Sequence, residues 1–427
     1  MAIRRRAFLT LTGGLAAAAG LTACGSNTGR PEPGGSASAS GGGAKPTLSQ
    51  WYHEYGEDGV EEAVKKYAAA YDKATVTVQW NPGDYEKLVS SALLTDKAPD
   101  VFEYANGPTL DMIKAGQALD LTAMLGDAKP QFTQSVLDAA SWEGKVYAIP
   151  QTVDMQMLFY RKSALDKAGI APPATIDDLI KAVPAVKTKD MGGFYAGTDG
   201  GIGVLSSMFI WAAGQEQISA DKTTIGFDNA EGHAAFAKFA ELAAADGYVP
   251  SASGDWSTAS PFVNGETAMQ WSGLWILPEV TDALGDDFGV LPFPSVGAAG
   301  RQAVPFGAFG ACVNAKGKNV EAATEFVRWL WVDQEADQLE FSNAFGTHIP
   351  AKTALVPKAD KVASGAGAEA AKFVAEGGHA NDKLWTPAIQ QAITAAVTNV
   401  VQKKADPKSE IAEVAATAKA DIKRLNG

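Results

Sequence analysis

The sequence has very few of the side chains that bind transition metals. Its 427 residues include only two cysteines and four histidines, and the histidines are scattered along the chain. Metal sites need several such ligands close together. We therefore expect no metal and no other cofactor. Cys312 lies in the apolar stretch 309–313, where a buried, inert thiol is expected.

Positive charge is also scarce. The chain has 36 Lys and Arg against 49 Asp and Glu, which gives a formal net charge of −13. An acidic surface argues against nucleic acid as a partner and against electrostatic binding to anionic lipid. It also disfavours anionic ligands.

The motifs of several common enzyme classes are absent. The sequence has no Gly-x-Ser-x-Gly motif, no completed His-Glu-x-x-His motif after His53-Glu54, and no phosphate-binding Gly-Lys-Thr loop. These absences argue against an enzyme.

The N-terminal segment has the pattern of an export signal. Arg4, Arg5 and Arg6 precede an uncharged run, 7–23, which is too short and too rich in glycine to cross a bilayer as a helix. Residues 1–23 are therefore predicted to be a signal peptide. The arginines resemble the twin-arginine export pattern, and the general secretory route is the alternative.

A lipid anchor is predicted directly after this signal. Leu21-Thr22-Ala23-Cys24 resembles the bacterial lipobox, which implies cleavage before Cys24 and a diacylglycerol on its thiol. Cys312 is then left without a partner, so no disulfide is expected. Loss of the three arginines makes the net charge −16. Residues 24–45, rich in Gly, Ser, Ala and Pro, are predicted to form a flexible tether.

The rest of the chain alternates between predicted strands and helices. Strands are expected at 47–51, 75–80 and 100–104, with amphipathic helices between them. This order predicts an α/β architecture with parallel strands, and such sheets bind ligands beyond the carboxyl ends of their strands. About 380 residues exceed what one core usually supports, so two domains are expected. The stretches 148–161, 291–309 and 345–351 are predicted to pass between them.

Several short motifs, in order and at consistent spacing, resemble the extracellular solute-binding proteins of ATP-binding-cassette sugar importers, the group typified by maltose-binding protein. The motifs are Ala98-Pro99-Asp100-Val101-Phe102, Tyr147-Ala148-Ile149-Pro150, Leu158-Phe159-Tyr160-Arg161-Lys162, Phe262 to Met269, and Pro292-Phe293-Pro294. The likeness spans nearly the whole mature chain.

The resemblance implies a two-lobed periplasmic-binding-protein-like fold of the α/β class. Each lobe is expected to hold a mainly parallel sheet flanked by helices, and a three-segment hinge joins the lobes. The N-lobe is predicted over 46–151 and 306–346, and the C-lobe over 152–305 and 347–427. A monomer of this kind closes on a sugar and docks on transmembrane permease subunits.

A sugar site needs flat aromatic faces, together with carboxylates or amides that bond several hydroxyls. Trp275, Trp385 and Asp154 match ligand-binding positions of the family. The other candidates follow predicted strands or lie in the tryptophan-rich segment 256–275, and alternation lets only one of Glu103 and Tyr104 point inward. They are Trp256, Trp271, His53, Glu54, Glu103, Tyr104 and Asn106.

Two other functions are weighed against a sugar carrier. A surface glycoside hydrolase needs two carboxylates about 5 to 10 Å apart, and acidic pairs occur by chance in an acidic chain. A binder of a phosphorylated polyol needs cations at the cleft, and Arg161 is the only arginine near a predicted crossing. The acidic and aromatic residues together favour a neutral sugar, a di- or oligosaccharide, whose linkage and identity the sequence leaves open.

Overall fold

The computed structural model describes residues 45–55 and 57–426. The predicted signal peptide, Cys24 and the tether up to Ala44 lie outside the described residues. The five-stranded sheet near the start of the chain has the order β2-β1-β3-β12-β6. Its strands are β1 (Thr47–His53), β2 (Thr75–Asn81), β3 (Val101–Ala105), β6 (Ile149–Pro150) and β12 (Phe309–Val313).

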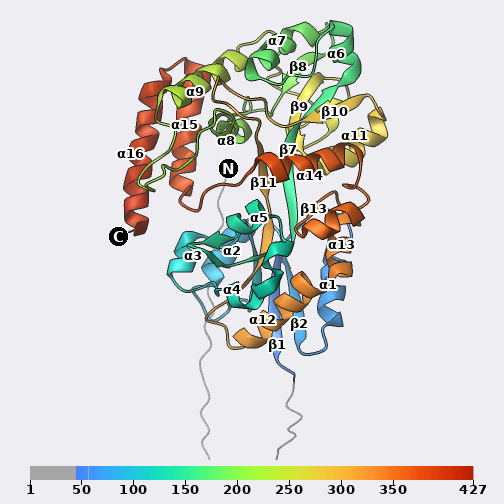
Figure 1. Cartoon of the computed structure of the whole chain (residues 1–427), viewed down its shortest axis with the longest axis vertical. Coiled ribbons are helices and arrows are strands. Elements are labelled where there is room, and N and C mark those ends of the chain that lie inside the picture. Colours follow the sequence, from blue (N-terminus) through green and yellow to red (C-terminus); the bar gives the residue numbers. More distant parts are fainter. Residues whose placement is uncertain (1–44, 56, 427) are drawn as a thin grey trace, which may run out of the picture. The chain divides into compact units, whose positions relative to one another are not determined.

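Alternation along β1 explains how this sheet positions its residues. Leu48 and Tyr52 are buried on one face, while Trp51 and His53 on the other face are partly exposed. The strands predicted at 47–51, 75–80 and 100–104 are confirmed as β1, β2 and β3, and β1 pairs in parallel with both neighbours. Their carboxyl ends therefore lie at the same edge of the sheet, and Figure 1 shows β1 and β2 side by side.

A second sheet is built around the long strand β7 (Thr152–Arg161). Its order is β14-β11-β7-β9-β8, and β10 and β13 also pair with β7. These strands are β8 (Gly192–Tyr195), β9 (Thr267–Gly273), β10 (Phe288–Leu291), β11 (Val304–Gly307), β13 (Ile349–Pro350) and β14 (Gly378–His379). A separate hairpin joins β4 (Ser141–Trp142) and β5 (Lys145–Val146).

The strand directions are mixed rather than mainly parallel as expected. β12 runs antiparallel to β3 and β6. In the second sheet β9, β10, β11 and β13 all run antiparallel to β7. Among the described strands of this second sheet, only β8 with β9 and β11 with β14 form parallel pairs. Antiparallel neighbours need no helical crossover, so later segments can return directly along the long β7.

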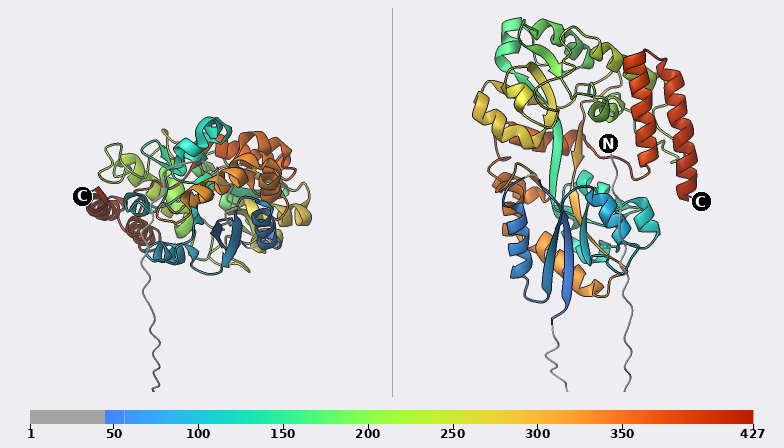
Figure 2. Two further views of the ribbon diagram at one scale, coloured as in Figure 1. Left: turned by 90° about the horizontal axis from the view of Figure 1, so that it is seen from below. Right: turned by 180° about the vertical axis from the view of Figure 1, so that it is seen from behind.

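Helices cover both sheets, and Figure 2 shows α15 and α16 side by side near the C-terminus. The helices that accompany the first sheet are α1 (Val60–Ala70), α2 (Tyr85–Ala92), α3 (Leu110–Lys114), α4 (Thr122–Leu125), α5 (Gln134–Ala139), α12 (Val320–Arg328) and α13 (Glu335–Asn343). The others are α6 (Lys162–Ala168), α7 (Ile176–Val186), α8 (Ile202–Ala212), α9 (Ala230–Ala243), α10 (Ser260–Val263), α11 (Leu277–Leu284), α14 (Gly365–Gly377), α15 (Pro387–Lys403) and α16 (Pro407–Asn426). Short helical turns are η1 (Gly126–Gln131), η2 (Leu274–Ile276), η3 (Trp329–Asp333) and η4 (Thr353–Lys358).

Within the described part of the chain, no helix combines the length and apolar character needed to cross a membrane.

The chain moves between the two sheets within very few residues. β6 belongs to the first sheet and β7, which begins two residues later, belongs to the second. Ala308 alone separates β11 of the second sheet from β12 of the first. The third predicted crossing, 345–351, contains β13, which pairs with the start of β7. The lobe boundaries themselves stay a prediction.

Two large apolar clusters hold the elements in place. One includes Tyr67 and Trp331 beside the first sheet, and the other includes Phe209 and Phe239, whose rings stack at 4.5 Å between α8 and α9. Burying such a side chain contributes about 1.5 to 3 kcal/mol. Packing on this scale fixes the strand ends that carry the candidate site.

Candidate functional site

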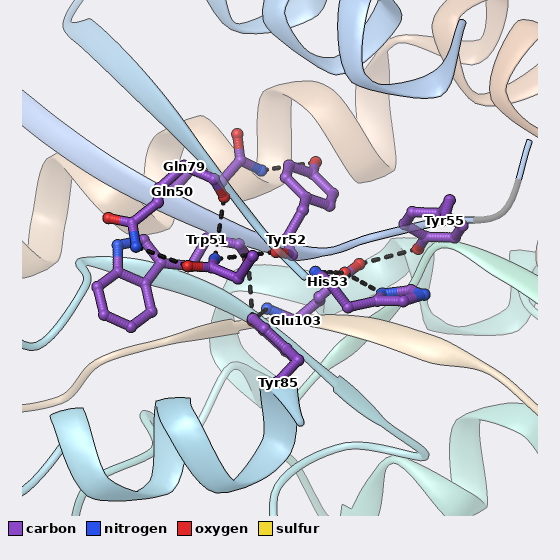
Figure 3. Close-up of polar contacts among 9 residues, drawn as sticks. Gln50, Trp51, Tyr52, His53, Tyr55, Gln79, Tyr85 and Glu103 are labelled. Carbon is purple, nitrogen blue, oxygen red and sulfur yellow. Dashed lines mark hydrogen bonds and ion pairs between the residues drawn. The ribbon is translucent and has the colours of Figure 1, made fainter. Parts of the chain in front are cut away.

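A buried carboxylate lies where β1 and β3 end (Figure 3). Glu103 of β3 is 1% exposed. Its Oε1 accepts from the backbone N–H of His53 at 2.6 Å and also bonds His53 Nδ1, and its Oε2 accepts from the Tyr55 hydroxyl at 2.9 Å. Burial first, and then the charge of Glu103, raise the pKa of Tyr55 well above its ordinary value. Tyr55 is therefore a neutral phenol that donates to the carboxylate.

A second acidic group lies on the strand that enters the second sheet. Asp154 of β7 receives a hydrogen bond on Oδ1 from His348 Nδ1 at 2.6 Å, and His348 Nε2 lies 3.4 Å from Glu57 Oε1. Burial opposes the charge on His348, but the charge and hydrogen bonds of Asp154 and Glu57 outweigh it and raise its pKa to about 10. The Asp154 side chain is 32% exposed, and no hydrogen bond from the described residues reaches its Oδ2. That oxygen is open to a ligand hydroxyl.

Two tryptophans meet edge to face beside β9. The rings of Trp256 and Trp275 have centroids 5.7 Å apart and planes inclined at 68°. The indole N–H of Trp275 donates to the Ser257 carbonyl at 2.8 Å. Both side chains are half-buried, so each has some surface left for a ligand.

A cavity of about 750 Å³ lies between the loop after β3 and the start of α15. Tyr104, Asn106, Lys383 and Trp385 line it. The place of Trp385 follows from the helix that starts after it, because Thr386 caps the first turn by accepting from the Ile389 N–H and a proline begins the helix.

Lys383 closes one side of this cavity. Its Nζ donates to the carbonyls of Asn106 at 3.0 Å and Pro108 at 3.2 Å. Burial lowers the pKa of Lys383 to about 8. Its ammonium is thus already bound to two backbone oxygens.

A neighbouring cavity of about 610 Å³ shares Lys383 with the first. It is lined by the Trp142 ring, with Lys222 Nζ 4.7 Å from the ring centroid, and by His379, whose ring stacks on Trp211. Aromatic faces and hydrogen-bonding groups therefore line both cavities.

The structure brings some of the predicted residues together and separates others. His53 bonds Glu103, Trp256 contacts Trp275, and Tyr104, Asn106 and Trp385 share one cavity. Glu54 is exposed just after β1.

Other predicted residues have most of their surface covered. Trp271 is fully buried and donates to Gln156 Oε1 at 2.8 Å. Both Glu103 and Tyr104 are buried, although alternation was expected to leave one of them facing the cleft. Asn106 pairs with Ala308 through its own N–H at 2.8 Å and its Oδ1 at 3.0 Å. As ligand contacts, all ten residues stay predictions.

Sequence reasoning missed several residues of this region. They are Tyr55, Trp142, Phe309, His348, His379 and Lys383. His348 has no acidic neighbour in the sequence that would mark it. The aromatic residues at 52–55, directly after a strand, were a usable signal for Tyr55. Among the described residues there is no cluster of His, Cys, Asp and Glu able to hold a metal ion.

Comparison with known protein families identifies the family of this chain. Residues 57–337 match the family described as bacterial extracellular solute-binding protein. The chain belongs to this family. It is a family of solute-binding proteins and not of enzymes.

Curated relatives of this solute-binding protein come from several bacteria. It is 34% identical over 171 residues to the melibiose/raffinose/stachyose-binding protein MelE of Bacillus subtilis, a match covering 36% of this chain and 38% of that protein. It is 24% identical to the galactooligosaccharide-binding protein of the same bacterium over 94% of both chains. For MelE and two further relatives, the match covers less than half of the relative's own length.

Solved structures share the fold at low sequence identity. The sugar-binding protein MalE from Xanthomonas citri aligns with a TM-score of 0.75 at 20% identity, over 89% of this chain and 98% of that one. The cyclic alpha-maltosyl-1,6-maltose binding protein from Arthrobacter globiformis aligns with a TM-score of 0.72 at 19% identity, over 90% and 100%. The chain therefore has the two-lobed α/β fold of periplasmic binding proteins.

Proposed function

We propose that this protein captures a neutral sugar of two or more rings between two closing lobes and delivers it to an ATP-binding-cassette permease. The observation that carries the proposal is the cavity between the loop after β3 and the start of α15, where Trp385 and Tyr104 lie among amide and carboxylate groups. Flat rings beside such groups are what a pyranose requires. The names of the relatives, which refer to melibiose, raffinose, stachyose and galactooligosaccharide, agree with this class.

The charged groups of the region favour a neutral ligand over a phosphorylated one. The Lys383 ammonium is bound to two carbonyls, and Arg161 donates to the carbonyls of Phe262 and Val263. Asp154 and Glu57, by contrast, add negative charge beside the candidate site. In the 750 Å³ cavity a phosphate group would have to displace the bonds of Lys383 or the pair of Arg424 with Asp421, and it would approach the carboxylates of Glu86 and Asp111.

The test is a thermal-shift panel of neutral di- and trisaccharides alongside their phosphorylated counterparts. At a concentration one hundred times its Kd, a sugar that binds only the folded state stabilises it by about 2.7 kcal/mol. We expect such a shift with one or more neutral sugars, and with the same sugar a smaller radius of gyration in X-ray scattering, because the ligand favours the closed state. Stabilisation by phosphorylated compounds alone would refute the proposal.

The membrane attachment is a separate part of the proposal. We place the mature protein, as a monomer, on the extracytoplasmic face of the cell membrane through a lipid on Cys24, with the lobes divided at residues 151, 305 and 346. Cys24→Ser should abolish incorporation of labelled fatty acid and release the protein into the medium, because a hydroxyl is much less nucleophilic than a thiol. Ala23→Gly, which keeps a small residue before the cysteine, is the control, and labelling that persists in Cys24→Ser would contradict the anchor.

A further inference from the structure

The carboxylate of Glu103 has no oxygen left for a ligand. Besides His53 and Tyr55, the Gln151 amide, when turned to satisfy both of its neighbours, donates to Oε2 at 3.1 Å and accepts from Trp331 Nε1 at 3.2 Å. Four donors therefore converge on the two oxygens, counting both the backbone and the ring N–H of His53. A buried carboxylate surrounded by donors acts as an acceptor only.

The surroundings of the His53 ring leave one edge open. Phe309 stacks on the ring with centroids 4.0 Å apart and planes 18° apart, and the Tyr55 ring lies 3.9 Å away. Nδ1 is bonded to Glu103. The side chain is still 21% exposed, and Nε2 has no hydrogen-bond partner among the residues that the structure describes.

We infer that Glu103 is a positioning residue, which acts on the sugar through His53 without touching it. By accepting from Nδ1–H, Glu103 directs the ring so that Nε2 is the nitrogen left for a ligand, and in a neutral ring this nitrogen carries the lone pair. This inference rests on the proposed function, since it assigns Nε2 as an acceptor for a ligand hydroxyl.

The fixed tautomer has a consequence for specificity. In the neutral ring, an Nε2 that only accepts favours a ligand group that donates, as a sugar hydroxyl does, and disfavours a carboxylate or phosphate oxygen. Tyr55 gives its proton to Oε2, so its hydroxyl helps to hold the carboxylate in place.

Other charged groups also face this ring and must be considered in any pH titration. Glu57 and Glu86 are the nearby carboxyl groups on which a positive charge on His53 would act, and the Tyr85 ring lies 6.1 Å from the imidazole. Among these groups Glu103 alone bonds Nδ1.

The first test needs no sugar. Ring nitrogen chemical shifts of His53 in the full chain, measured at a pH where the ring is neutral, should show the proton on Nδ1. In Glu103→Gln, the amide can also donate to Nδ1, so the Nε2–H tautomer should become populated. An Nε2–H tautomer in the wild type, or an unchanged tautomer in Glu103→Gln, overturns the inference.

The second test asks whether Glu103 acts through His53. In His53→Asn the amide nitrogen takes the place of Nδ1 and keeps the bond to Glu103, but the ligand contact at Nε2 is lost. We expect about a tenfold loss of sugar affinity in Glu103→Gln and in His53→Asn, and about the same loss, not a hundredfold one, in the double variant. Additive losses would mean that Glu103 contacts the sugar itself and would overturn the inference.

The two tests separate failure of the inference from failure of the proposed function. If no neutral sugar binds the wild type, the proposed function fails, and the tautomer measurement still decides whether Glu103 positions His53. If sugar binds and the tautomer is Nε2–H, only the inference fails. Tyr55→Phe is the matched control, because it removes one bond to Glu103 and leaves the Nδ1 contact intact.

Discussion

Trp275→Ala is expected to weaken binding of the best neutral sugar at least about thirtyfold, which corresponds to about 2 kcal/mol. The Trp275 ring is held by its bond to the Ser257 carbonyl and by edge contact with Trp256, so it is ordered before ligand arrives. Truncation removes a large, preorganised contact surface, and the loss should appear as a higher Kd in calorimetry.

The control variants separate stacking from folding. Trp275→Phe keeps a flat face and should lose much less affinity than Trp275→Ala. Trp329→Ala removes a ring that packs against Tyr71 and Phe326 beside the first sheet, so it should reduce stability but leave Kd unchanged. Wild-type affinity in Trp275→Ala would remove this residue from the site and shift attention to Trp385.

His348→Gln is expected to lower the free energy of unfolding by about 3 kcal/mol at pH 6, because it leaves Asp154 and Glu57 without their cation. The two carboxylates come from segments that meet at the start of β7, so this histidine also ties those segments together. Urea unfolding of the wild type and the variant measures the difference.

The pH dependence of this difference has a definite sign. The pKa of His348 is about 10 in the folded protein, above the ordinary value of about 6.5 expected for the unfolded chain. The contribution is therefore fully present below about pH 6.5 and is lost as the pH rises toward 10. The gap between wild type and His348→Gln should narrow across this window.

A second histidine provides the control for that experiment. His233 of α9 bonds Asp228, which precedes the helix, at 2.9 Å and is more exposed than His348, so His233→Gln should change stability by less than about 1 kcal/mol. A gap for His348→Gln that stays constant from pH 6 to pH 10 would show that the imidazole is neutral in the folded state.

Local sequence patterns were sufficient to predict β1, β2 and β3 of the first sheet, but not β12. Alternation in 47–51 and 75–80 gave β1 and β2, and the apolar stretch 148–161 contained both β6 and β7. Strand direction could not be predicted in the same way. The antiparallel returns of β9, β10 and β11 along β7 depend on contacts between segments more than a hundred residues apart.

The candidate site was predictable where strand ends carry polar or aromatic residues. His53 ends β1 and bonds Glu103 of β3, and Asn106, which follows β3, lines the cavity that Trp385 shares. Burial was not predictable from the sequence, so alternation left either Glu103 or Tyr104 as the residue facing the ligand, although four donors enclose Glu103. His348 was missed because its two acidic partners, Asp154 and Glu57, are nearly two hundred or more residues away in sequence.

The most direct measurement of the central claim is a calorimetric titration of the wild-type protein with the neutral sugar selected by the panel, followed by chromatography of the sugar released from the complex. The account predicts one sugar bound per chain and its complete recovery in intact form after prolonged incubation. Conversion of the sugar to shorter products, or saturation with none of the neutral sugars, would contradict it.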